Sequence, residues 1–144
     1  MGYITTYSLE WQDIEKRPIP QDADTLKVLA DLDAIGDPKI AADMRRRLNV
    51  HERTYNDLIA ELIEADEDAN YALSPDGSSL EPCKWYDWEI SMRKISKEVP
   101  GVLFTLYGEG EESGDIWNAY LLNGKMHKEN AQIVIPPFDK EKLS

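Results

Sequence analysis

The sequence predicts an α+β fold in which helices cover one face of an antiparallel sheet of four to five strands. Three observations support this class. A run of aromatic and β-branched residues opens the chain at 3–11. Apolar residues then recur with helical spacing, most clearly at 85–99. A run of β-formers at 115–122 ends at Asn123-Gly124, a dipeptide typical of a β-hairpin turn, and a more polar run follows. One sheet with helices on one face is the simplest packing for elements in this order.

The first half of the chain predicts one strand followed by three short helices. We expect the strand at 3–11 and the helices at about 22–35, 38–48 and 50–66. Alternate residues of the strand, beginning with Tyr3, form its more apolar face. An aspartate, Asp22 or Asp24, can cap the first helix. Gly36 ends that helix, and Pro38 suits the first turn of the next one.

The second half predicts a helix followed by a meander of strands. We expect a short strand at 70–73, a helix at 85–99, strands at 102–107, 115–122 and 125–130, and an apolar continuation at 131–135. The helix has an apolar seam with spacings of three and four residues, formed by Trp85, Trp88, Met92, Ile95 and Val99. Pro136-Pro137 ends the last strand.

This order of elements predicts a single α+β domain over residues 1–137, close to a ferredoxin-like arrangement with an added helical segment. The mainly helical segment 12–68 lies within the domain, and 138–144 forms a loose tail. A chain of 144 residues is long enough to bury a core of its own.

Composition favours a cytoplasmic protein that binds neither free nucleic acid nor membranes. The net charge is −12, which repels phosphate backbones and anionic lipid surfaces and can attract a basic protein surface. Solubility alone also explains this charge. No apolar run approaches the roughly 18 residues that span a bilayer, and the first residues do not resemble a signal peptide. The single cysteine, Cys83, fits a reducing compartment.

An acidic, glycine-rich loop at 108–115 is the first candidate contact site. Its carboxylates fall within seven residues and belong to Glu109, Glu111, Glu112 and Asp115. They can contact a basic partner, bind a divalent cation, or form an ordinary solvated hairpin loop. The EF-hand ligand spacing is absent, so the cation alternative is weak. The loop also lacks the lysine of a phosphate-binding loop, and its charge repels phosphate.

Two aromatic residues, Tyr86 and Trp117, are the second set of candidates. We expect both side chains to be exposed and to anchor a partner, because exposed aromatic residues are typical interface anchors. Trp85 and Trp88 have the spacing of core residues instead.

The remaining reactive or charged residues form no catalytic, metal or cofactor site that can be recognised from the sequence. We interpret His51 and His127 as surface histidines and Cys83 as an inert thiol. The basic run 45–47 is interpreted as a solvated helix face, which nearby acids can neutralise. Those acids are Asp43, Glu52 and Asp57. The protein is therefore expected not to be an enzyme.

The motif KWYD at 84–87, with GEGEESGDIW at 108–117 and NGK at 123–125, resembles a small family of largely uncharacterised phage and mobile-element proteins. That family is similar to the ferredoxin-like domain of YubB-type proteins. The resemblance covers about 1–11 and 69–137, and it brings no catalytic residue. It implies a phage or prophage origin.

The leading functional hypothesis is a non-enzymatic, acidic module that binds and modulates a host protein, including a role in countering a defence system. A second hypothesis is a small-molecule or nucleotide-binding domain, which can be enzymatic and uses the exposed sheet face. A third is a structural dimer formed by edge-strand pairing. The sequence is compatible with either a monomer or a homodimer.

Overall fold

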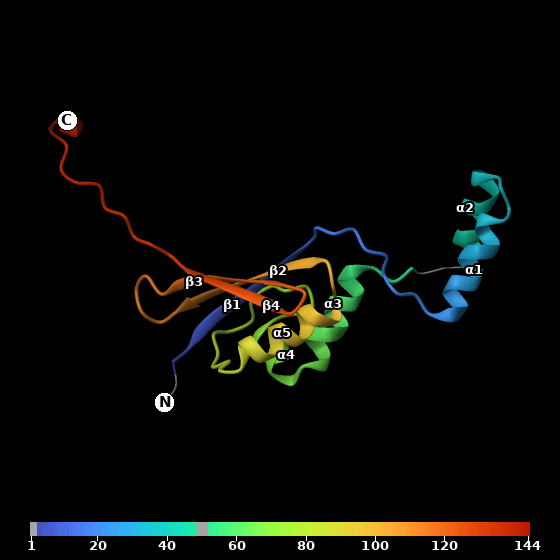
Figure 1. Cartoon of the computed structure of the whole chain (residues 1–144), viewed down its shortest axis with the longest axis horizontal. Coiled ribbons are helices and arrows are strands. Elements are labelled where there is room, and N and C mark those ends of the chain that lie inside the picture. Colours follow the sequence, from blue (N-terminus) through green and yellow to red (C-terminus); the bar gives the residue numbers. More distant parts are fainter. Residues whose placement is uncertain (1–2, 49–51) are drawn as a thin grey trace.

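The computed structural model describes residues 3–48 and 52–144, and a four-stranded antiparallel sheet forms its centre (Figure 1). The strands are β1 (Thr5–Asp13), β2 (Val102–Gly110), β3 (Ile116–Leu122) and β4 (Lys125–Asn130). They lie side by side in that order, and every neighbouring pair is antiparallel. The predicted α+β class and the antiparallel sheet are therefore confirmed.

The described α-helices lie between β1 and β2 in the chain, and β2, β3 and β4 then follow as a continuous meander. A short 3-10 helix at Lys140–Lys142 comes last. The helices are α1 (Ala23–Asp33), α2 (Pro38–Arg47), α3 (Tyr55–Ala65), α4 (Glu67–Ala72) and α5 (Trp88–Glu98). This order does not show the ferredoxin-like topology, because no described α-helix follows β2.

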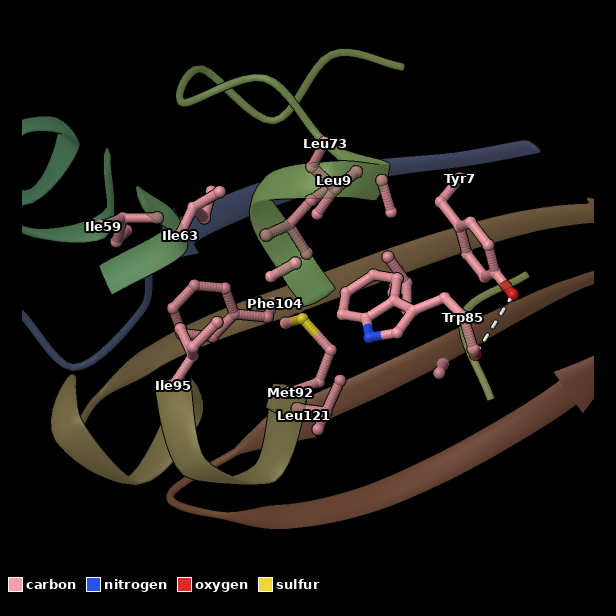
Figure 2. Close-up of a cluster of buried hydrophobic side chains, with 14 of the residues drawn as sticks. Tyr7, Leu9, Ile59, Ile63, Leu73, Trp85, Met92, Ile95, Phe104 and Leu121 are labelled. Atoms are coloured by element: carbon pink, nitrogen blue, oxygen red, sulfur yellow. Dashed lines mark hydrogen bonds between the residues drawn. The ribbon is translucent and has the colours of Figure 1, made fainter. Parts of the chain in front are cut away.

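The core lies between the sheet and helices α3, α4 and α5, which cover one face of the sheet (Figures 1 and 2). Successive strand residues point to opposite faces, so alternate residues of β2 and β3 are buried there. Side chains from the sheet and the helices meet in this layer. They include Leu9, Phe104 and Leu121 from the strands and Ile59, Ile63, Met92 and Ile95 from the helices. We call the sheet face away from these helices the open face.

Side-chain caps set the helix boundaries and correct two expectations. Thr54 and Asp57 form a capping box, so α3 begins at Tyr55 rather than near residue 50, which lies outside the described residues. Asp66 accepts a hydrogen bond from the Ala69 backbone N–H and starts α4.

The predicted strand at 70–73 was therefore wrong, because most of that segment is the end of α4. Ala69 and Ala72 are buried three residues apart, as on one face of a helix, and a segment of four residues is too short to distinguish that pattern from strand alternation. Leu73 makes only an isolated bridge with Ser79.

The last helix also begins later than the apolar seam predicts. α5 starts at Trp88, so Trp85 lies in the preceding connection, yet its side chain is buried. Tyr7 packs edge-on against the Trp85 ring with a centroid distance of 5.2 Å. The Tyr7 hydroxyl donates a hydrogen bond to the Trp85 carbonyl oxygen at 3.4 Å (Figure 2). The core position of Trp85 is thus fixed by β1 rather than by a helical turn.

Helices α1 and α2 form a hairpin, residues 22–48, that stands apart from the sheet, and we call it the helical arm (Figure 1). Gly36 has φ +78° and supplies the left-handed turn between the two helices. Gln21 links the base of the arm to the residues just before α3. Its side-chain amide donates to the Arg53 carbonyl oxygen at 2.8 Å and accepts from the Arg53 N–H at 2.7 Å. The predicted helical segment 12–68 therefore has two parts. α3 and α4 pack on the core, whereas α1 and α2 project away from the sheet.

The chain leaves the sheet after β4, and residues 131–144 extend away from the body (Figure 1). The predicted apolar strand continuation at 131–135 is not formed, although the Ala131 N–H still donates to the Ile116 carbonyl oxygen at 2.8 Å. β3 ends its pairing at Ile116 and Trp117, so the residues after Ala131 have no strand beside them. A strand needs such a neighbour to satisfy its backbone groups.

We expect Phe104→Ala to lower the free energy of unfolding by about 3–5 kcal/mol, because Phe104 is fully buried at the centre of the sheet. The matched control is Thr105→Ala, which changes the neighbouring residue on the open face. Urea unfolding followed by tryptophan fluorescence measures both. Equal losses for the two variants would contradict the assignment of the two faces.

Candidate functional site

The acidic loop connects β2 to β3 and closes on itself through backbone hydrogen bonds. The Gly110 N–H donates to the Asp115 carbonyl oxygen at 2.8 Å, and the Asp115 N–H donates to that of Glu112 at 3.1 Å. Gly114 has φ +83°, a conformation that suits glycine. Glu109, Glu111 and Glu112 are exposed, and Asp115 is half-buried.

Two of the loop carboxylates accept hydrogen bonds within the molecule, from the residues that lead into β1. The Tyr3 hydroxyl donates to Asp115 Oδ2 at 2.6 Å and accepts from the Glu112 N–H at 2.8 Å. The Ile4 N–H donates to Glu111 Oε1 at 2.9 Å. The hydrogen bond to the Asp115 carboxylate raises the pKa of the Tyr3 phenol above its ordinary value. Glu109 and Glu112 are the carboxylates of the loop best placed to face a partner.

The two predicted aromatic anchors differ in exposure. Tyr86 is 71% exposed, as predicted, whereas Trp117 is 6% exposed and belongs to the core. Trp117 stacks on Trp88 with a centroid distance of 4.7 Å, and the Lys128 ammonium lies 4.9 Å from its ring. The expectation that Trp117 is exposed was therefore wrong.

The burial of Trp117 depends on a residue in the neighbouring strand. Gly108 pairs with Trp117 across β2 and β3, and a Cβ atom at Gly108 would lie 2.2 Å from the indole. A glycine inside a predicted strand often marks such a close approach. Gly108 is the sequence signal for this burial, but it falls in the expected loop at 108–115 rather than inside the expected strand at 102–107.

Tyr86 and the acidic loop lie near the same end of β1. Thr5 pairs with Gly110 on one side of the strand and forms a bridge with Cys83 on the other. The first residues of the strand therefore separate the loop from the Cys83–Tyr86 connection. The predicted contacts share one end of the sheet. Trp117 also lies there, opposite Gly108, but its side chain is buried in the core.

Residues 133–138 form an apolar surface that the sequence did not identify as a contact site. Four large side chains there are 73–84% exposed, those of Ile133, Val134, Ile135 and Phe138. Monomeric proteins seldom leave so many neighbouring apolar side chains in water. The same run, Ile-Val-Ile before Pro-Pro, had predicted a strand, and that apolar pattern was the signal for this surface.

The open face carries two shallow hollows along β3 and β4. The larger has a volume of about 390 Å³ and is lined by Leu103, Tyr120, Leu122, Lys125 and His127, among others. Tyr120 and His127 pair across the strands, with ring centroids 6.0 Å apart. The smaller hollow, about 200 Å³, lies between Tyr107 and Glu129. A small flat ligand can rest in either hollow.

The other reactive and charged residues mostly have local partners. Burial raises the pKa of the Cys83 thiol, which keeps it protonated and unreactive. The Nε2 atom of His127 lies 2.6 Å from Glu129 Oε1.

The basic run on α2 is neutralised largely as predicted. Arg46 and Arg47 pair with Asp43, and Arg45 pairs with Glu52. His51 lies outside the described residues.

Across 3–48 and 52–144, no group of three or more His, Cys, Asp or Glu side chains is arranged to hold a metal ion. Within the same residues, no helix has both the length and the apolar character needed to span a bilayer.

No family model matches the chain, and neither the curated proteins nor the solved structures include a significant match. The resemblance to phage and mobile-element proteins therefore stays a prediction.

We expect Asp115→Ala to lower the pKa of Tyr3 toward its ordinary value, because the hydrogen bond to the carboxylate favours the protonated phenol. An NMR titration of carbon-labelled tyrosine measures this shift. Tyr107 is the internal control, since its hydroxyl bonds Glu109 rather than Asp115. An unchanged Tyr3 pKa would show that the contact does not form in solution.

Proposed function

We propose that this protein is a non-enzymatic binding module whose main contact element is the exposed apolar segment 133–138. The observation behind the proposal is the exposure of its four large apolar side chains, each at least 73% accessible. Burying an isoleucine or phenylalanine side chain contributes about 1.5–3 kcal/mol, so a groove that accepts several of them binds this segment well. A folded partner supplies that burial more effectively than this chain does alone.

The segment is suited to adding a strand to the edge of a partner's sheet. Ile133 and Ile135 fall on one side of an extended chain and Val134 on the other. Main-chain hydrogen bonds then supply affinity, and pockets for alternate side chains supply specificity. Pro136 and Pro137 limit the added strand to the residues before them, because proline has no N–H to donate.

The net charge of −12 favours a partner with a basic surface beside its sheet edge. Exposed Glu109, Glu112 and Tyr86 are the secondary contacts in this proposal. The resemblance to phage and mobile-element proteins makes a host protein the expected partner, and makes countering a defence system one expected outcome.

We expect Ile133→Asp with Ile135→Asp to abolish capture of the partner from host lysate, because charged side chains cannot enter an apolar groove. The matched control is Gln132→Asp with Ser144→Asp, which adds the same two charges and removes no apolar side chain. Affinity purification with quantitative mass spectrometry, at low and high salt, compares the three proteins.

Binding through the apolar segment should weaken only moderately as salt rises, since screening acts on the charged contacts. Equal capture by the double isoleucine variant and the wild type would contradict the proposal. Complete loss at high salt would shift the main contact to the acidic loop.

A second candidate function, binding of a small planar ligand, is favoured by the 390 Å³ hollow beside Tyr120 and His127. Its volume is at the lower end of the range of ligand pockets. A ligand that binds there raises Tm by mass action. We expect Tyr120→Ala to remove that shift in a metabolite screen and the control Tyr86→Ala to keep it. A screen that shifts no Tm in the wild type would count against this function.

A further inference from the structure

The helical arm leaves most of its apolar surface in water. Of the described residues in α1 and α2, only Leu32 is buried. The arm exposes four large apolar side chains by 41–57%, those of Leu26, Ile40, Met44 and Leu48. Ile40, Met44 and Leu48 follow at intervals of four residues, so they form one stripe along α2.

Two short helices with so little mutual burial are not expected to be stable alone. α1 has 11 residues and α2 has 10, and isolated helices shorter than about 12–15 residues are marginal in water. Side-chain caps support the start of each helix, through Asp22 and Asp37. Caps satisfy backbone groups and cover no apolar side chain. Further packing must therefore stabilise the arm.

The contact between the two helices is also incomplete. A hollow of about 290 Å³ lies between them, and it is lined by Leu29, Leu32 and Asp33 of α1 and by Ala41, Ala42 and Arg45 of α2. Alanines on α2 face leucines on α1, so the hairpin alone does not fill the space. The hollow exceeds the volume of one leucine or methionine side chain, so a residue from outside the hairpin can fill it.

The charges of the two helices identify the surface that would fit there. α1 carries three aspartates and one lysine, a net charge of −2, while α2 carries four basic residues and one aspartate, a net charge of +3. Among the described residues, no ion pair joins α1 to α2, and the arginines of α2 pair with Asp43 and Glu52. A surface that complements the arm is acidic opposite α2 and basic opposite α1. A second arm provides both.

We infer that the helical arms of two copies of this chain pack together as a four-helix bundle, with α1 of each copy beside α2 of the other. The exposed stripe on α2 enters the hollow of the second hairpin, and the oppositely charged helices become neighbours. Bundles of two antiparallel hairpins joined by short loops are an established packing for such helices. The dimer is symmetric because each copy gives and receives the same contact.

The size of the arm sets the strength of this association. Two helices about 16 Å long present one face each, so the paired arms bury on the order of 1,200 Å² in total, near the lower limit of stable specific interfaces. The dimer should therefore dissociate on dilution. The interface is separate from the sheet edge at β4 and from the segment 133–138.

Sedimentation equilibrium of the full chain tests the inference, with the chain mass of 16.5 kDa as the reference. We expect the wild type to reach twice that mass as concentration rises. Ile40→Ser with Met44→Ser and Leu48→Ser should stay at the monomer mass at the same concentrations. The matched control replaces Ile133, Val134 and Ile135 by serine and should dimerise as the wild type does.

Charge reversal tests the arrangement of the helices. Asp31→Arg with Asp33→Arg makes both helices of the arm positive, and Arg45→Glu with Arg47→Glu makes both negative. Each variant alone should be monomeric, and an equimolar mixture should form a dimer of one copy of each. Near-ultraviolet circular dichroism of the tryptophans checks that the body stays folded in every variant.

Several outcomes would overturn the inference. One is a wild type that stays monomeric at all concentrations, and another is a dimer that survives the triple serine change in the arm. A dimer lost only in the serine control at 133–135 would assign association to that segment instead. Charge-reversed variants that dimerise alone as strongly as the wild type would exclude the α1–α2 pairing.

Discussion

The pairing of β1 with β2 is the contact on which the rest of the structure depends. The two strands pair residue for residue from Thr5 with Gly110 to Asp13 with Val102, although all five described α-helices lie between them in the chain. A shift of this register by one residue would move Tyr7 and Leu9 from the core to the open face. The same pairing positions the acidic loop beside the residues that enter β1 and the Cys83 connection on the other side of the strand.

The covered face of the sheet has a limited area, and this accounts for the division of the helices. α3, α4 and α5 fill the layer above Phe104 and Leu121, and their buried residues are among the least accessible in the chain. Little of that face is left for α1 and α2, which pack chiefly on each other. The two candidate contact surfaces, the helical arm and the segment 133–138, therefore both lie outside the layer that stabilises the fold.

Elements defined by local chemistry could be predicted from the sequence. Asn123 and Gly124 both have positive φ values, as the predicted hairpin turn requires, and the inward face of β1 follows its apolar alternation. Errors arose where the outcome depends on a distant residue. Trp117 is buried because Gly108 leaves room for its ring, and the residues after Ala131 lack a neighbouring strand. The spacing of apolar residues indicates whether a segment is a helix or a strand. It does not indicate which other element that segment packs against.

The long separation between β1 and β2 also shapes how the chain reaches its fold during synthesis. The meander from β2 to β4 has short connections and can form as soon as it leaves the ribosome, whereas β1 is made first and has no partner until residue 110 has emerged. At synthesis rates of about 5–20 residues per second, the first strand waits for several seconds with its aromatic face uncovered. High contact order of this kind slows folding. The nascent chain therefore exposes the apolar face of β1 until β2 has been made.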